Sequence, residues 1–76
     1  MQYSDVQTFT YLEKTETVGL VVKASGGNLV IAAKSGNDYI TADTINADLV
    51  TEYFVKGLTL RFTPSGGCTF SIRGGD

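Results

Sequence analysis

Side chains that could carry out chemistry are scarce in this sequence. It contains one cysteine, Cys68, and no histidine, so the usual general base for a serine or cysteine nucleophile is missing. Cys68 alternates with Phe70 and Ile72, which predicts a strand with the thiol turned into the core. Structural zinc needs about four Cys or His ligands, and this chain cannot supply them. We expect no catalytic residue, no metal and no cofactor.

The acidic residues offer a second kind of chemistry. Asp38, Asp43 and Asp48 are spaced five residues apart around two predicted turns, a spacing that could suggest calcium. An EF-hand loop places oxygen ligands at alternate positions and a glycine at its sixth, and this stretch does not match. Aspartate also favours turns, because its carboxylate hydrogen-bonds the backbone two residues ahead. We therefore interpret the three as turn-forming residues and expect a protein that is not an enzyme.

The length of the chain limits how it can be stabilised. Its 76 residues are expected to form a single small β domain over 1–76, as a complete gene product. A core of this size rarely supplies more than ~3–5 kcal/mol, and natural mini-proteins often add disulfides, a metal or oligomerisation. Because a lone cysteine cannot form an intrachain disulfide, oligomerisation is the reinforcement left open. We expect a homo-oligomer or a place in a larger protein assembly.

Charge and hydropathy narrow the possible partners. The net charge is −2 and the six cations are scattered along the chain, so no basic run predicts binding to duplex DNA or an anionic membrane. The first residues lack the basic start and apolar run of a secretory signal. The longest apolar run, Leu29 to Ala33, is far shorter than the ~20 residues of a membrane span. We expect a soluble protein made in the cytoplasm.

Short alternating segments divided by Gly/Ser/Asn turns dominate the chain. Ser25-Gly26-Gly27-Asn28 has the chemistry of a tight turn and predicts a hairpin between the segments on either side of it. Ser35-Gly36-Asn37-Asp38 predicts a second turn, and Pro64-Ser65-Gly66-Gly67 the last one. Strands are expected at 6–12, 17–24, 29–34, 39–42, 49–55, 58–63 and 68–72.

The stretch 43–56 admits two interpretations. As a helix near 44–56 it would begin at Thr44 as N-cap and carry Ile45, Leu49 and Tyr53 on one stripe, giving an α+β fold. As a strand it would extend only from 49 to 55, after a tight turn at 46–48, and its β-branched and aromatic residues favour this state. We predict an all-β protein, a small antiparallel barrel or two-sheet sandwich of six or seven short strands in a meander.

One segment carries a resemblance. The run Gly57-Leu58-Thr59-Leu60-Arg61-Phe62-Thr63-Pro64-Ser65-Gly66-Gly67 resembles the strand-turn endings of small virion accessory proteins of tailed bacteriophages, such as head decoration, head completion or tail components. The resemblance covers 11 residues and carries no functional residue across. It implies a homo-oligomer, a homotrimer or larger, docked on a capsid or tail surface and incorporated in the virion.

The leading hypothesis is a non-enzymatic structural or assembly protein that makes contacts through β surfaces. Aromatic residues are enriched at the cores of interfaces. The candidate interface residues are those least easily placed inside so small a core: Tyr3, Phe9, Tyr11, Tyr53 and Phe54.

The alternative is a small β-barrel that binds single-stranded nucleic acid or a small ligand. Such barrels stack bases on aromatic side chains over a positive groove. Phe9 and Tyr11 share one strand face, and Lys56-Gly57 before Leu58 to Phe62 is similar to the basic-Gly-aromatic run of cold-shock domains. Leucines stand here where that family has its stacking aromatics.

Overall fold

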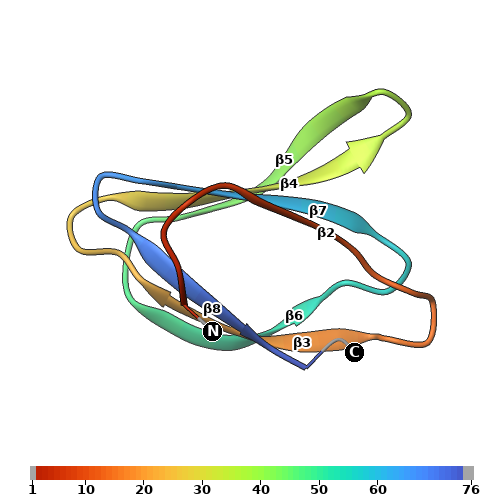
Figure 1. The fold of residues 1–76 in the computed structure, drawn as a ribbon, viewed down its shortest axis with the longest axis horizontal. Helices are drawn as coiled ribbons and strands as arrows, with labels where there is room; N and C mark the ends of the chain where they lie inside the picture. Colours follow the sequence, from red (N-terminus) through yellow and green to blue (C-terminus); the bar gives the residue numbers. More distant parts are fainter. Residues whose placement is uncertain (1, 75–76) are drawn as a thin grey trace.

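The chain folds into two packed antiparallel sheets (Figure 1). The computed structural model describes residues 2–74. Sheet A has the strand order β1-β8-β3-β6, and sheet B has the order β2-β7-β4-β5. Among the described residues, no helix is long and apolar enough to cross a membrane. The strands are β1 (Gln2–Tyr3), β2 (Gln7–Thr10), β3 (Thr17–Lys23), β4 (Asn28–Ser35), β5 (Asp38–Ile45), β6 (Leu49–Phe54), β7 (Thr59–Ser65) and β8 (Thr69–Arg73).

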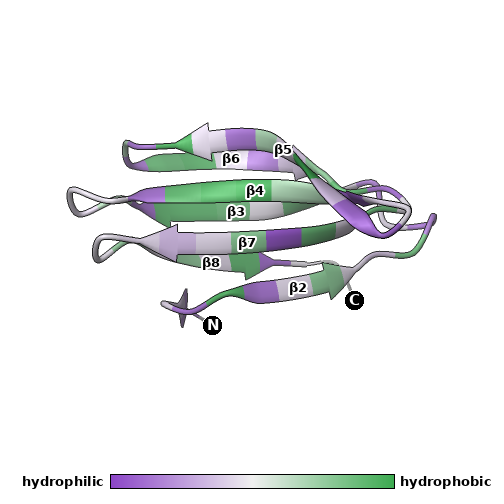
Figure 2. Cartoon of the chain, turned by 90° about the horizontal axis from the view of Figure 1, so that it is seen from above, coloured by the Kyte–Doolittle hydropathy of each residue, from purple (hydrophilic) through white to green (hydrophobic). Residues whose placement is uncertain are grey.

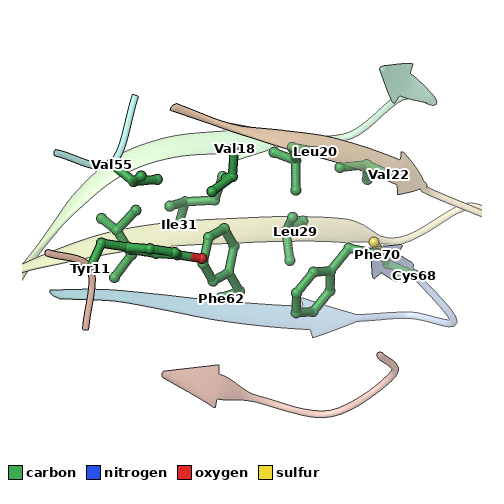
Figure 3. Packing of buried hydrophobic residues seen from close by; sticks show 11 residues of the cluster. Tyr11, Val18, Leu20, Val22, Leu29, Ile31, Val55, Phe62, Cys68 and Phe70 are labelled. Carbon is green, nitrogen blue, oxygen red and sulfur yellow. The ribbon is translucent and has the colours of Figure 1, made fainter. Parts of the chain in front are cut away.

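The core lies between the sheets and follows from the period-2 alternation of the strands (Figure 3). Alternate side chains of each central strand point into the core: β3 buries Val18, Leu20 and Val22, and β7 buries Leu60 and Phe62. Cys68 and Phe70 are also buried, so the thiol lies in the core as expected. The largest fully buried side chains come from both sheets: Phe62, Phe70, Leu20, Leu29, Ile31, Leu60 and Val55.

The all-β class and the two-sheet sandwich are confirmed, and the barrel alternative is wrong, because the strands form two separate four-stranded sheets. Residues 2–74 contain eight strands instead of six or seven, since the two-residue β1 was not foreseen. β5 is also longer than the predicted 39–42.

The helix near 44–56 is wrong as well. β5 continues to Ile45, and the chain turns at 46–48 and enters β6, as the strand interpretation predicted. β6 pairs with β3 from Val22↔Leu49 to Thr17↔Phe54, so tertiary pairing supports the residues' preference for an extended backbone.

The predicted meander is wrong, and so is the hairpin at 25–28. β3 belongs to sheet A and β4 to sheet B, so this turn carries the chain from one sheet to the other. Every other connection in residues 2–74 also crosses between the sheets, except the one between β4 and β5. Those two strands form a hairpin through the predicted turn at Ser35↔Asp38. Alternation cannot distinguish the two, because an apolar strand face can meet its neighbour across the core as well as beside it.

Two of the turns that cross between the sheets are in close backbone contact. We call Ala24–Gly27 the first arch, between β3 and β4, and Gly66–Cys68 the second arch, between β7 and β8. A Cβ placed on Gly27 would lie 1.8 Å from the Ser65 carbonyl oxygen. The Ser65 hydroxyl also donates a hydrogen bond to Asn28 Oδ1 at 2.8 Å. Gly27 is therefore required by the close approach of two backbones.

Gly27→Ala should be much more destabilising than Gly36→Ala. The first change forces the two arches apart, and we expect the free energy of unfolding to fall by at least about 3 kcal/mol. Gly36 has φ of 62° at the tip of the β4–β5 hairpin with open space around it, so its alanine variant should lose only about 1–2 kcal/mol from backbone strain. Urea denaturation of both variants measures the difference, and equal losses would contradict the close contact of the arches.

Candidate functional site

Three of the predicted interface residues gather on one lateral side of the sandwich, between β1 and β2. The ring centroids of Tyr3 and Phe9 lie 5.8 Å apart, and those of Phe9 and Tyr11 lie 6.1 Å apart. Tyr3 also packs against Phe70 and Phe9 against Phe62, so the group joins the core aromatics. Tyr3 and Phe9 are half-buried. Both pack against the core cluster between the sheets.

Tyr11 is the most enclosed of the three, with only 7% of its surface exposed. Its hydroxyl is buried and has no hydrogen-bond partner among residues 2–74 (Figure 3). Burial raises the pKa of this phenol above its ordinary value, and the nearby Tyr3 raises it further. The ring of Tyr11 stabilises the core, while its unpartnered hydroxyl opposes that gain.

Tyr53 lies on the opposite lateral side, in β6. It pairs with the buried Val18 and therefore points inward, and its hydroxyl donates a hydrogen bond to Asp43 Oδ2 of β5 at 2.6 Å. Burial raises the pKa of Tyr53, and the hydrogen bond and charge of Asp43 raise it further. Since β5 and β6 are the edge strands of different sheets on the same side of the molecule, this bond fastens the two layers together (Figure 2).

Phe54 and its neighbour Val50 differ from the other candidates because they face outward. Their partners in β3 are Thr17 and Val21, which alternate with the buried residues of that strand. Val50 is 78% exposed and Phe54 is 60% exposed, on the outer face of sheet A. Val50 was not among the predicted interface residues. The available signal was that the segment 49–55 is apolar at both alternate sets of positions, so one set had to face away from the core.

The chemically reactive side chains are dispersed. Asp48 lies in the predicted turn and accepts a hydrogen bond from the Ala24 backbone N–H, but Asp43 lies inside β5, so its assignment to a turn was wrong. Among residues 2–74, no group of three His, Cys, Asp or Glu side chains could hold a metal ion. Burial raises the pKa of the Cys68 thiol, and the charge of Asp48 raises it further. The described part of the chain encloses no pocket.

The aromatic pair considered for base stacking lies between the sheets. Phe9 packs on Phe62 and Tyr11 is buried, so neither ring forms an open platform on a strand face. On the outer face of sheet B, Tyr39 is covered by Arg61, whose guanidinium carbon lies 4.1 Å from the ring centroid.

The fold and these surfaces define the protein as a small antiparallel β-sandwich with an open edge at β6. Comparison with protein families, with curated proteins and with solved structures found no match. A function for this chain is therefore inferred from its geometry, and above all from β6, which carries both Tyr53 and Phe54.

Tyr53→Phe should lower stability, and its effect should depend on pH. Losing the bond to Asp43 should cost about 1 kcal/mol at pH 7. The folded state raises the pKa of Tyr53, whereas an unfolded tyrosine ionises near pH 10. The stabilisation is therefore complete below pH 10 and declines above it. Urea denaturation should show a smaller gap between wild type and variant at pH 11 than at pH 7, and an equal gap would contradict the assignment.

Tyr11→Phe should have the opposite effect. It keeps the buried ring and removes a hydroxyl that has no partner in the described structure, so we expect stability to rise by about 1 kcal/mol. Thermal melting of this variant beside Tyr53→Phe provides a matched comparison of the same chemical change. A loss of stability in Tyr11→Phe would mean that the hydroxyl is satisfied, for example by a buried water.

Proposed function

We propose that this protein is a non-enzymatic structural or assembly protein that acts as a homo-oligomer. The observation that carries the proposal is the outward placement of Val50 and Phe54 on β6, an edge strand whose open side pairs with no other strand of residues 2–74. A partner could remove both side chains from water and also pair with the backbone of β6. Burial of apolar area stabilises association at roughly 25 cal/mol per Å² before the entropic cost of binding is subtracted.

The small core gives this association a second role. The buried hydrophobic residues form one cluster between two sheets of four strands each, in a chain of 76 residues. A folded state of modest stability gains from any partner that binds it and not the unfolded chain. Self-association would therefore supply stabilisation that a disulfide or metal supplies in other proteins of this size.

The virion of a tailed bacteriophage is the setting we propose, from the resemblance of residues 57–67 to small virion accessory proteins. In such a particle the same chain is present in many copies, so one weak contact surface is used repeatedly. The copies would dock as a homo-oligomer on the capsid or tail.

Static light scattering across a concentration series tests self-association. We expect the mass to rise from the 8.1 kDa of one chain to a fixed multiple as concentration increases from low micromolar to hundreds of micromolar. A mass of one chain at every concentration, in low and high salt, would overturn the homo-oligomer proposal.

A further inference from the structure

The backbone of β6 has an open side whose groups can be identified residue by residue. Val55 donates its N–H to the Glu16 carbonyl, which continues the pairing of β6 with β3 beyond Thr17↔Phe54. In an antiparallel pair, alternate residues direct both their N–H and C=O groups to the same neighbour. The set that bonds to β3 begins at Leu49 and is the one that includes Val55. The alternate residues of β6 are Val50, Glu52 and Phe54. Their backbone groups therefore point to the open edge.

The other three edges of the sandwich are blunted. β1 has two residues and β2 has four, so neither offers a long template. β5 is interrupted by a register shift where it passes Ile31 and Ala32, and it carries Asp38 and Asp43. Short strands, irregularities and charges are the usual devices that prevent edge-to-edge pairing. β6 is six residues long with an unbroken register and one charge, Glu52.

The carboxylate of Glu52, the one charged group on β6, is directed away from the open edge. Glu52 Oε2 accepts a hydrogen bond from the Thr17 hydroxyl at 3.1 Å, so its carboxylate is held over β3. Opposite Glu52 stands Gly19, whose lack of a side chain leaves room for the carboxylate on this face. The open edge is therefore flanked on the outer face by the apolar Val50 and Phe54.

We propose that two copies of this chain pair antiparallel through β6, about a two-fold axis at Glu52, and join their A sheets into one eight-stranded sheet. This inference rests on the proposed function and names its interface. With the axis at Glu52, all three open residues of each strand find hydrogen-bonded partners. Val50 of one copy stands opposite Phe54 of the other, which gives two apolar cross-strand pairs on the outer face.

The charges flanking β6 fit a second copy in the same register. Asp48 immediately precedes the strand and Lys56 follows it by two residues. Both residues are exposed, although Asp48 Oδ1 already accepts the hydrogen bond from the Ala24 N–H and only the other carboxylate oxygen is left for a partner. The two-fold axis brings Asp48 of one copy toward Lys56 of the other at each end of the paired strands. Glu52 meets its own symmetry mate at the centre, which is the one unfavourable pair. An isologous interface of this kind closes on itself and ends at a dimer.

Amide hydrogen exchange of the wild-type protein tests the pairing directly. In dilute solution the N–H groups of Val50, Glu52 and Phe54 should exchange rapidly, because they face water. At concentrations where the mass has doubled, these three amides should become protected, while an exposed turn amide such as Asn37 should stay unchanged. A dimer in which the three remain unprotected would overturn the β6 interface and leave self-association intact.

Glu52→Pro tests the same backbone groups by mutation. Proline removes an N–H that points away from β3, so the monomer loses no backbone hydrogen bond and only the exposed side-chain bond from Thr17 to Glu52, and proline is tolerated at such edge positions. We expect a folded monomer at every concentration, with circular dichroism like that of the wild type. A Glu52→Pro protein that still dimerises would overturn the proposal.

Side-chain variants provide the test if the proline variant does not fold. Val50→Lys should weaken the dimer by about tenfold, since it replaces one member of each apolar cross-strand pair with a charged side chain. Ile40→Lys is the matched control, because Ile40 is 61% exposed on β5 and should leave the dissociation constant unchanged. Glu52→Gln should tighten the dimer by about threefold by removing the central repulsion.

The outcomes separate the two proposals. A wild-type protein that is monomeric throughout would refute self-association and the β6 interface together. An oligomer that responds equally to Val50→Lys and Ile40→Lys, or not at all to Val50→Lys, would refute the interface and keep self-association. Weakening by Val50→Lys alone, with tightening by Glu52→Gln, is the result that supports pairing through β6.

Discussion

The contact between the two arches is the constraint on which the rest of the sandwich depends. β3 and β8 lie side by side in sheet A, and β4 and β7 lie side by side in sheet B, so both arches cross the core at the same end of the molecule. The crossing fixes the spacing of the layers there and faces the apolar sides of the four central strands toward each other. Gly27 permits this approach because any side chain would overlap the Ser65 carbonyl.

The same connectivity determines how the two lateral sides differ. One side is closed by aromatic rings, with Tyr3 and Phe9 filling the space between β1 and β2. The other side is joined by the Tyr53 to Asp43 hydrogen bond and by the short turn between β5 and β6. The β4–β5 hairpin extends beyond the sandwich, which leaves Ile40 exposed (Figure 1). The side of β5 and β6 therefore carries the two longer edge strands, beside the exposed Ile40 and Val50.

Stability and assembly place opposite demands on β6. Its inward residues Thr51, Tyr53 and the following Val55 pack toward the core, while Val50 and Phe54 on the outward set remain apolar in water. An isolated monomer would be more soluble with polar residues at those two positions. The strand also directs backbone groups to an open edge, and the apolar Val50 and Phe54 beside that edge support the proposed pairing with another strand.

The sequence by itself determined the all-β class, the position of most strands and the inward residues, because side-chain alternation and turn chemistry are local properties. It placed Cys68 in the core, the Ser35–Asp38 hairpin and the turn before β6 correctly. Only the tertiary structure decided which strands are neighbours: the glycine turn at 25–28 reads the same whether it closes a hairpin or crosses between sheets. It also decided which aromatic side chains are buried, because burial depends on what the rest of the chain packs against each ring: Tyr11 is 7% exposed, whereas Phe54 on the outer face of sheet A is 60% exposed.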